Sequence, residues 1–128
     1  MKLLLDTHAL LWWWAADARL SKRATKAMAD EANSVLVSAA SAWEIATKFR
    51  IGKLPGAQTA IDQFEMLLVA DGFEHLAINA RHALRAGSFD VNHRDPFDRM
   101  LAAQALAEGA TLVTDDAAMK LFRVKCLW

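Results

Sequence analysis

The sequence predicts an α/β fold, specifically a three-layer α/β/α sandwich in which helices cover both faces of a mainly parallel sheet. Short apolar runs alternate with longer helical patterns along the 128 residues, and this alternation implies right-handed βαβ crossovers. The hydrophobic fraction of 55% is rich in alanine, as expected where helices pack on both faces of a buried sheet. The length favours a single domain over residues 1–128.

The first half of the chain begins with a strand that leads directly into a helix. Ser21 is placed to cap the second helix. The run Val35-Leu36-Val37 is β-branched and apolar, as is typical of a strand, and Ile45 and Phe49 are spaced for one face of the next helix. The expected elements are strand Lys2–Leu5, helix Thr7–Ala16, helix Ser21–Glu31, strand Ser34–Val37 and helix Ser41–Arg50.

Proline and glycine mark the boundaries in the second half. Residues 52–56 form the clearest loop, and Pro96 and Gly109 are typical of the start and the end of a long helix. The expected elements are helix Thr59–Ala70, strand Phe73–Ile78, a short helix near Ala80–Ala86, helix Pro96–Gly109, strand Thr111–Thr114, a short helix Asp116–Phe122 and a last strand Val124–Leu127.

Four carboxylates recur close to the ends of predicted strands or the starts of predicted helices: Asp6, Glu44, Asp98 and Asp116. In an open parallel sheet, ligands bind at the edge where the carboxyl ends of the strands meet. Acids that arrive there from distant parts of the sequence would form one pocket, and such a pocket suits Mg²⁺ or Mn²⁺. Since phosphoryl chemistry is the common work of these pockets, the pattern predicts a metal-dependent enzyme acting on phosphate esters.

Each acid also has a purely structural interpretation as a helix cap. Ser41-Ala42-Trp43-Glu44 matches the capping box, and Asp95 is placed as the N-cap of the long helix with Asp98 in its first turn. Capping does not, however, require an acid at every crossover on one sheet edge. Asp6 is the hardest to explain this way, because it ends a strand expected to be central, where a buried carboxylate needs a compensating charge.

The order of several motifs carries a family resemblance. Leu-Leu-Asp-Thr-His occupies 4–8, an acid lies on the helix after the second strand, Asp-Arg-Met-Leu-Ala-Ala-Gln-Ala occupies 98–105, and Leu-Val-Thr-Asp-Asp occupies 112–116. In this order the motifs resemble the PIN domain, and more particularly the VapC-type toxins of bacterial toxin–antitoxin modules. The resemblance covers essentially the whole chain and implies a PIN-like α/β/α ribonuclease.

The resemblance also implies which residues carry the chemistry. Asp6, Glu44, Asp98 and Asp116 match the four catalytic acids, and of these Asp6, Asp98 and Asp116 are expected to bind Mg²⁺ or Mn²⁺. Thr114 matches the polar residue beside the last acid, and Asp116 rather than Asp115 fits the pattern. Asp95 accompanies the third acid in a subset of the family, and capping is its preferred role. Four acids could serve two ions, or one ion with an acid left as base.

The charge balance gives no general sign of a nucleic-acid partner. The chain has 15 basic and 15 acidic residues, whereas nucleic-acid binders usually show a basic excess. Two local clusters could still form a basic rim around an acidic pocket and contact RNA phosphates. They comprise Lys48, Arg50 and Lys53, and His93, Arg94 and Arg99. The alternative for each cluster is an ordinary solvated helix face.

The cysteine content and hydropathy favour a cytoplasmic protein. Cys126 is the only cysteine, which fits a reducing compartment. Asp6 comes too early for a secretory signal, and the longest apolar stretch, Ala9–Ala16, is far shorter than the roughly 20 residues of a membrane span. We therefore expect no membrane association.

The run Trp12-Trp13-Trp14 cannot lie on one narrow helical stripe, because successive side chains point about 100° apart. At least one tryptophan should therefore remain near the surface, where tryptophan commonly marks an interface. The family resemblance implies a homodimer and a cognate antitoxin that covers hydrophobic grooves. A tryptophan-rich core without a partner is the alternative.

Two other functions are compatible with an acidic pocket in such a fold. The first is a PIN-like module that binds RNA or protein without catalysis, against which the complete set of four acids argues. The second is a receiver-type signalling domain, which needs an acid pair after the first strand and a phosphoacceptor Asp after the third. Here Asp6 is alone and no Asp ends the Val35–Val37 strand. A metal-dependent endoribonuclease toxin is therefore the leading hypothesis.

Overall fold

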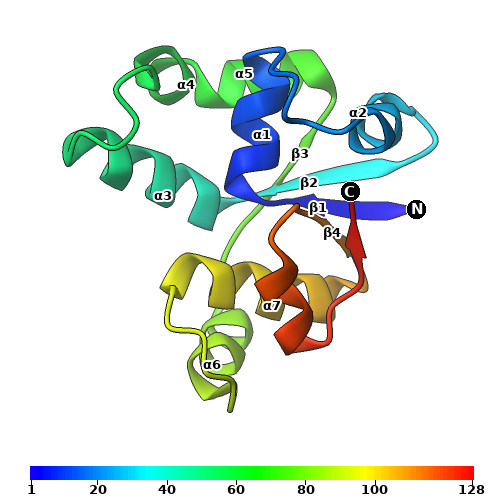
Figure 1. The fold of residues 1–128 in the computed structure, drawn as a ribbon, viewed down its shortest axis with the longest axis vertical. Helices are drawn as coiled ribbons and strands as arrows, with labels where there is room; N and C mark the ends of the chain where they lie inside the picture. The colour runs from blue at the N-terminus through cyan, green and yellow to red at the C-terminus, as the bar shows by residue number, and fades with distance from the viewer.

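Five parallel strands form the centre of the computed structural model, which describes residues 1–128. All neighbouring strands pair in parallel, in the order β3-β2-β1-β4-β5. Helices lie above and below the sheet (Figure 1), so the predicted three-layer α/β/α sandwich is confirmed. The strands are β1 (Lys2–Leu5), β2 (Ser34–Ser38), β3 (Glu74–Leu76), β4 (Thr111–Val113) and β5 (Cys126–Leu127).

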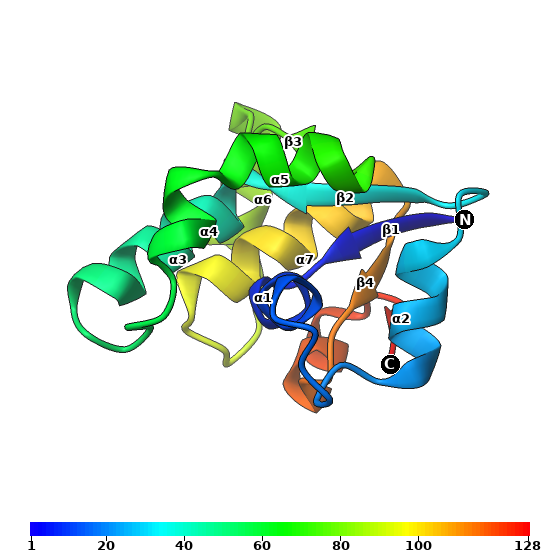
Figure 2. The same cartoon turned by 90° about the horizontal axis from the view of Figure 1, so that it is seen from above.

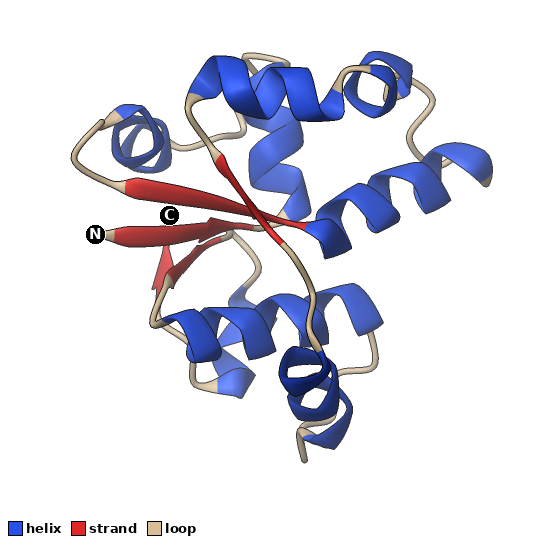
Figure 3. Cartoon of the chain, turned by 180° about the vertical axis from the view of Figure 1, so that it is seen from behind, coloured by secondary structure: helices blue, strands red, loops and turns tan.

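Helices from the first half of the chain cover one face of the sheet. Ser21 caps the second helix as predicted, since its hydroxyl accepts a hydrogen bond from the amide of Ala24 at 3.0 Å. The third helix extends from the carboxyl end of β2 and contacts helices of both layers (Figure 3). These elements are α1 (Thr7–Trp14), α2 (Lys22–Ala29), α3 (Ala39–Arg50), α4 (Gln58–Asp62) and α5 (Phe64–Asp71).

Helices from the second half cover the opposite face. α7 (Pro96–Glu108) packs on the sheet, α6 (Ala80–Ser88) packs on α7, and the short 3-10 helix η1 (Ala117–Phe122) follows β4. As predicted, Pro96 opens α7 and Gly109 ends it, with a left-handed φ of 62°. None of the helices combines the length and the hydropathy that a membrane span needs.

The alternation of side chains along β1 divides the core in two. Leu3 and Leu5 point into a cluster with Leu10 and Ile45 of α1 and α3. Leu4 points the other way, into a cluster that includes residues of α7 and η1. All three β1 leucines are fully buried, so the sheet is sealed on both faces at its centre.

Besides α3, which begins at Ala39 and not at Ser41, two predicted helices differ from the structure. The segment predicted as one helix over Thr59–Ala70 is two helices, because Gln63 leaves helical geometry with φ −118° and ψ 19°. Ile61 and Phe64, on either side of the break, both pack against the same core cluster. The helix predicted over Thr7–Ala16 ends at Trp14, since Ala16 adopts a left-handed φ of 50°.

Candidate metal centre

The strand order changes direction at β1. The chain adds β2 and β3 on one side of β1, and then β4 and β5 on the other, so the switch point lies between β1 and β4. Ligands of open α/β sheets bind at the carboxyl edge of this point. Asp6 directly follows β1, and its amide donates to the carbonyl of Val113 in β4 at 3.0 Å. Because α7 runs antiparallel to the strands, its first turn also lies at this edge (Figure 2).

Asp6 is a buried carboxylate that forms no ion pair. It is 8% exposed, and its Oδ1 accepts a hydrogen bond from the amide of Ala9 at 2.7 Å, which caps α1. Burial raises the pKa of Asp6 to about 6, against the opposing effect of hydrogen bonds from Thr114 and Ala9. Capping accounts for only one of its oxygens. The cap therefore orients the side chain and still leaves an acceptor for other work.

Thr114 connects the two acids at the strand ends. Its buried side chain lies next to the Asp6 carboxylate and lowers the pKa of that group, and its Oγ1 accepts the amide of Asp116 at 3.1 Å. Asp116 in turn caps η1 by accepting the amide of Ala118 at 2.9 Å. Asp115 is exposed and caps nothing, although its charge contributes to the raised pKa of Asp6.

Glu44 takes a different place from the one that the capping box predicts, and that prediction is wrong. α3 begins at Ala39, because the hydroxyl of Ser38 caps it by accepting the amide of Ala40 at 2.9 Å. Glu44 therefore lies within the helix, buried and 4% exposed. Its carboxylate accepts the hydroxyl of Thr7 at 2.5 Å and forms an ion pair with Lys48.

Asp98 lies in the first turn of α7, and Asp95 caps that helix as predicted. The Asp95 carboxylate accepts the amides of Phe97 at 2.8 Å and of Asp98 at 3.2 Å. Burial raises the pKa of Asp98, the bond to His93 opposes this shift, and the negative charges of Asp95 and Glu44 add to it. Asp95, Asp98 and Glu44 therefore belong to one electrostatic cluster.

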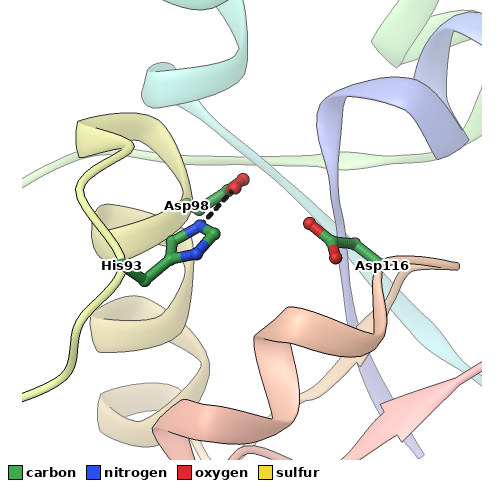
Figure 4. Close-up of side chains that lie close together, drawn as sticks. All are labelled: His93, Asp98 and Asp116. Atoms are coloured by element: carbon green, nitrogen blue, oxygen red, sulfur yellow. Dashed lines mark hydrogen bonds and ion pairs between the residues drawn. The ribbon is translucent and has the colours of Figure 1, made fainter.

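Three side chains meet most closely in this cluster. Nε2 of His93 lies 2.9 Å from Oδ2 of Asp98, and ligand atoms of His93, Asp98 and Asp116 all lie within 4.8 Å of one another. Asp98 comes from α7 and Asp116 from the start of η1, and the carboxylate of Asp116 points toward the other two side chains (Figure 4). Asp6 and Glu44 are outside this closest group. They are connected to it through Thr114 and through the charge of Glu44 on Asp98.

His93 is the member of this group that sequence reasoning missed. The sequence places it only in a basic cluster with Arg94 and Arg99, because histidine is common in packed and surface positions alike. Its spacing, two residues before Asp95 and five before Asp98, is the signal that could have found it. It becomes informative only once the loop before α7 is known to fold back onto the helix.

The basic residues expected at the rim divide into three kinds. Arg50 and Arg94 are exposed. Lys48 points into the site, where its bond to Glu44 and the charges of Asp95 and Asp98 outweigh desolvation and raise its pKa. The Arg99 guanidinium is occupied by backbone carbonyls of the preceding loop, among them Phe89 at 2.6 Å and His93 at 2.9 Å. Arg99 therefore holds the loop and is removed from the expected RNA-contacting set.

The tryptophan run is half-buried along its whole length. Trp13 packs against Phe73, and the Nε1 of Trp14 donates to Asp71 at 2.9 Å. Trp12 and Trp14 also line a groove of about 540 Å³. Lys53 lies in this groove, with Leu11, Asp17, Arg19, Leu54, Pro55 and Leu67 among its other lining residues.

The donor set fits a small divalent cation. Two carboxylates and an imidazole converge without a basic side chain fixed between Asp98 and Asp116, and buried acids stand beside them. Oxygen donors with one nitrogen suit Mg²⁺ or a first-row metal such as Mn²⁺. The site thus has the ligands for a metal that would offset its crowded negative charge.

The fold and this site define a PIN-domain protein. The model of the PIN domain family matches residues 3–125, and the chain belongs to that family. It is also 30% identical over 121 residues to Ribonuclease VapC22 of Mycobacterium tuberculosis (strain ATCC 25618 / H37Rv), an alignment that covers 94% of this chain and 91% of that protein. The chain is thus a PIN-domain protein similar to a protein of the VapC kind, and the resemblance indicated by its motifs is confirmed.

Two solved structures share the fold. VapBC2 from Rickettsia felis, bound to a DNA fragment from its promoter, has a TM-score of 0.67 at 17% identity and covers 100% of this chain and 99% of that chain. VapBC-1 from nontypeable Haemophilus influenzae has a TM-score of 0.66 at 19% identity, with 99% and 97% covered. At these identities the likeness concerns the fold alone.

Proposed function

We propose that this chain is the endoribonuclease toxin of a toxin–antitoxin pair and that it hydrolyses RNA phosphodiester bonds with Mg²⁺ or Mn²⁺. The observation that carries the proposal is the meeting of Asp98 and Asp116 at the switch point of a PIN-domain sheet. Buried Asp6 and Glu44 stand beside them. The similar protein named Ribonuclease VapC22 supports RNA as the substrate.

The side chains of the chain would divide the work between metal binding and proton transfer. Asp98 and Asp116 would hold the ion, with Asp6 next to them through Thr114. A bound divalent ion lowers the pKa of a coordinated water and offsets charge developing on the phosphate. With a pKa of about 6, Asp6 is mostly ionised at pH 7 and can accept a proton from the attacking water.

An exposed aromatic surface beside the acids suits unpaired RNA bases. Trp43 is 59% exposed, and its ring packs edge-on against Phe97 with 4.8 Å between centroids. Trp43 and Phe97 directly precede Glu44 and Asp98 in the chain. Stacking on aromatic rings is the usual way in which proteins hold unpaired bases. Arg50 and Arg94 are exposed cations that would contact phosphates, and Lys48 would do so from inside the site.

Cleavage of a labelled single-stranded RNA by the purified chain tests the proposed activity. Cutting should require Mn²⁺ or Mg²⁺, stop with a chelator and be lost in Asp98→Asn. Glu65→Gln makes the same charge change at an exposed position of α5 and should cut like the parent. RNA binding without cutting in either metal would favour a catalytically inactive module, and full cutting in chelator would contradict a metal centre.

The groove beside the tryptophans is the proposed docking site of the antitoxin. It is mainly apolar; Lys53 adds positive charge to its lining, while Arg19 is ion-paired with Asp17 of the same lining, so the groove suits a largely apolar segment. The VapBC structures that share the fold contain an antitoxin together with the toxin, which supports this kind of partner. A homodimer is also part of the proposal, and sedimentation of the purified chain measures it.

Co-purification with the cognate antitoxin, to be sought among small proteins encoded next to this chain, tests the groove. Leu54→Asp places a charge in the groove and should abolish co-purification; because Leu54 also packs against the core, thermal melting confirms that the variant is folded at the temperature of the assay. Leu84→Asp makes the same change at a residue of α6 that is 72% exposed, and it should leave binding intact. Equal binding by both variants would place the antitoxin elsewhere.

A further inference from the structure

The imidazole of His93 lies inside the acid cluster, although no step described above requires it. Its Nε2 is 2.9 Å from Oδ2 of Asp98, and it forms with Asp98 and Asp116 the only group of metal-binding side chains that converges within 4.8 Å (Figure 4). Neighbouring ligands of an octahedral ion lie about 3 Å apart when each bond to the ion is about 2.1 Å. The separation between His93 and Asp98 already has this value.

The loop that carries His93 is held in place before any metal arrives. The guanidinium of Arg99 donates to five backbone carbonyls, from Ala86 at the end of α6 to His93 itself at 2.9 Å. On its other side, the imidazole packs edge-on against Phe122, with 5.5 Å between ring centroids. Such a fixed position is what a metal site needs from a ligand, because little ordering remains to oppose binding.

The geometry points to His93 as a nitrogen ligand of the metal ion, together with Asp98 and Asp116, and as the residue that makes the centre prefer Mn²⁺ over Mg²⁺. The inference rests on the proposed function only for the presence of a divalent ion. Mg²⁺ takes oxygen ligands and gives up its waters reluctantly. Imidazole nitrogen suits first-row transition metals, so a site with this nitrogen gains more affinity for Mn²⁺ than for Mg²⁺.

A merely structural role for His93 would consist of its hydrogen bond to Asp98. Two substitutions separate that role from ligation. In His93→Gln the side-chain amide can still donate to Asp98, but the imidazole nitrogen is gone. In His93→Asp an oxygen ligand replaces the nitrogen, which should preserve metal binding and remove the preference for Mn²⁺.

Electron spin-echo spectroscopy of the Mn²⁺-loaded protein, labelled with ¹⁵N-histidine, tests the inference without reference to activity. The parent should show coupling between Mn²⁺ and ¹⁵N, and His93→Gln should lose it. His8→Gln, near Asp6, and His75→Gln, exposed on β3, should keep the coupling. The Mn²⁺ affinity of His93→Gln should fall by roughly tenfold or more, and the Mn²⁺-to-Mg²⁺ affinity ratio of His93→Asp should fall by at least about tenfold.

An unchanged spectrum and affinity in His93→Gln would overturn the inference, as would a parental affinity ratio in His93→Asp. Should the Gln variant fail to fold, the affinity ratio of the Asp variant alone decides. RNA cleavage is assayed separately on the same samples. Nitrogen coupling without cleavage would end the proposed function and leave His93 as a ligand, whereas cleavage without coupling would do the reverse.

Discussion

The acids of the metal centre come from two regions of the molecule, and the two regions manage negative charge differently. Asp6 and Asp116 follow β1 and β4, are joined through Thr114, and form no ion pair. Glu44 and Asp98 project from α3 and α7, and each has a basic partner. Lys48 is paired with Glu44, and His93 is bonded to Asp98.

This difference shows how a chain can fold around a site that a metal is expected to neutralise. At the strand ends the backbone fixes the position of each acid. Asp6 has no ion pair, and its burial raises its pKa. On the helices, Lys48 forms an ion pair with Glu44, and the bond to His93 opposes part of the rise that burial causes in the pKa of Asp98. We therefore expect changes at the strand ends to affect activity most, and changes to the basic partners to affect stability.

The largest expected effect separates two neighbours at the end of β4. Asp116→Asn should lower metal-dependent RNA cleavage by roughly a hundredfold or more, because Asp116 lies in the closest ligand group. Asp115→Asn should retain most activity, since Asp115 lies outside that group, although both residues are exposed. The measurement is the initial rate of RNA cleavage by both variants. An active Asp116→Asn paired with an inactive Asp115→Asn would reverse the assignment.

Asp6→Asn should also lose RNA cleavage, but its fold should be as stable as the parent or more so. Asparagine is a good N-cap and can still accept the amide of Ala9 that Asp6 accepts now. The substitution also removes a buried charge that burial disfavours. Cleavage rates and thermal melting in chelator measure the two effects. Cleavage at the parental rate would place the site elsewhere.

The pH dependence of stability provides a separate test of Asp6. Its pKa in the folded chain, about 6, is above the ordinary 3.8, so the folded state holds the proton more tightly than the unfolded state. The resulting stabilisation is complete below about pH 4 and is lost as the pH rises through 6, to a total of about 3 kcal/mol. In chelator, Asp6→Asn should therefore gain stability relative to the parent between pH 4 and 7. If the unfolding free energies of the parent and of Asp6→Asn change equally with pH over this range, burial does not raise the pKa of Asp6.

Removing a basic partner should have a moderate effect on stability. Lys48→Met keeps the length of the side chain but leaves Glu44, 4% exposed, without its ion pair. Because the Lys48 side chain is itself 27% exposed, we expect a loss of about 1–2 kcal/mol in chelator. Mn²⁺ should restore more stability to this variant than it adds to the parent. Lys26→Met, at an exposed position of α2, is the control. It should change neither the stability in chelator nor the stability that Mn²⁺ adds.

The smallest expected effect concerns the exposed cations. The double variant Arg50→Glu and Arg94→Glu should weaken RNA binding by roughly tenfold at low salt and reduce the salt slope of the affinity by about 2. Mn²⁺ affinity should not change. Lys22→Glu with Lys26→Glu on α2 has the same net charge and should bind RNA like the parent. Equal salt slopes in the two double variants would remove Arg50 and Arg94 from the RNA surface.

The fold was predictable from local signals, and so were the positions of the strand-end acids. Alternating apolar runs predicted the parallel sheet. The acids that follow β1 and precede η1 could be placed because the position of a residue directly after a strand is set by that strand. Asp95 and Pro96 marked the start of α7 correctly for the same reason, since a cap acts within one turn.

The environment of the helix acids depends on contacts between distant segments, which the sequence pattern does not contain. Glu44 matched a capping box, but Ser38 starts α3 earlier, and the true partner, Thr7, comes from α1. Arg99 resembled a rim cation because its charge was visible and the loop carbonyls that it binds were not. His93 was missed because only the folded loop brings it to Asp98.

The central claim is that acids from strand ends and helices form one metal centre at the carboxyl edge of the sheet. Anomalous diffraction from crystals soaked in Mn²⁺ measures this most directly. We predict a peak within about 2.5 Å of carboxylate oxygens of Asp98 and Asp116, and its loss in crystals of Asp116→Asn. A well-occupied peak elsewhere on the molecule, or no peak at this edge at saturating Mn²⁺, would contradict the claim.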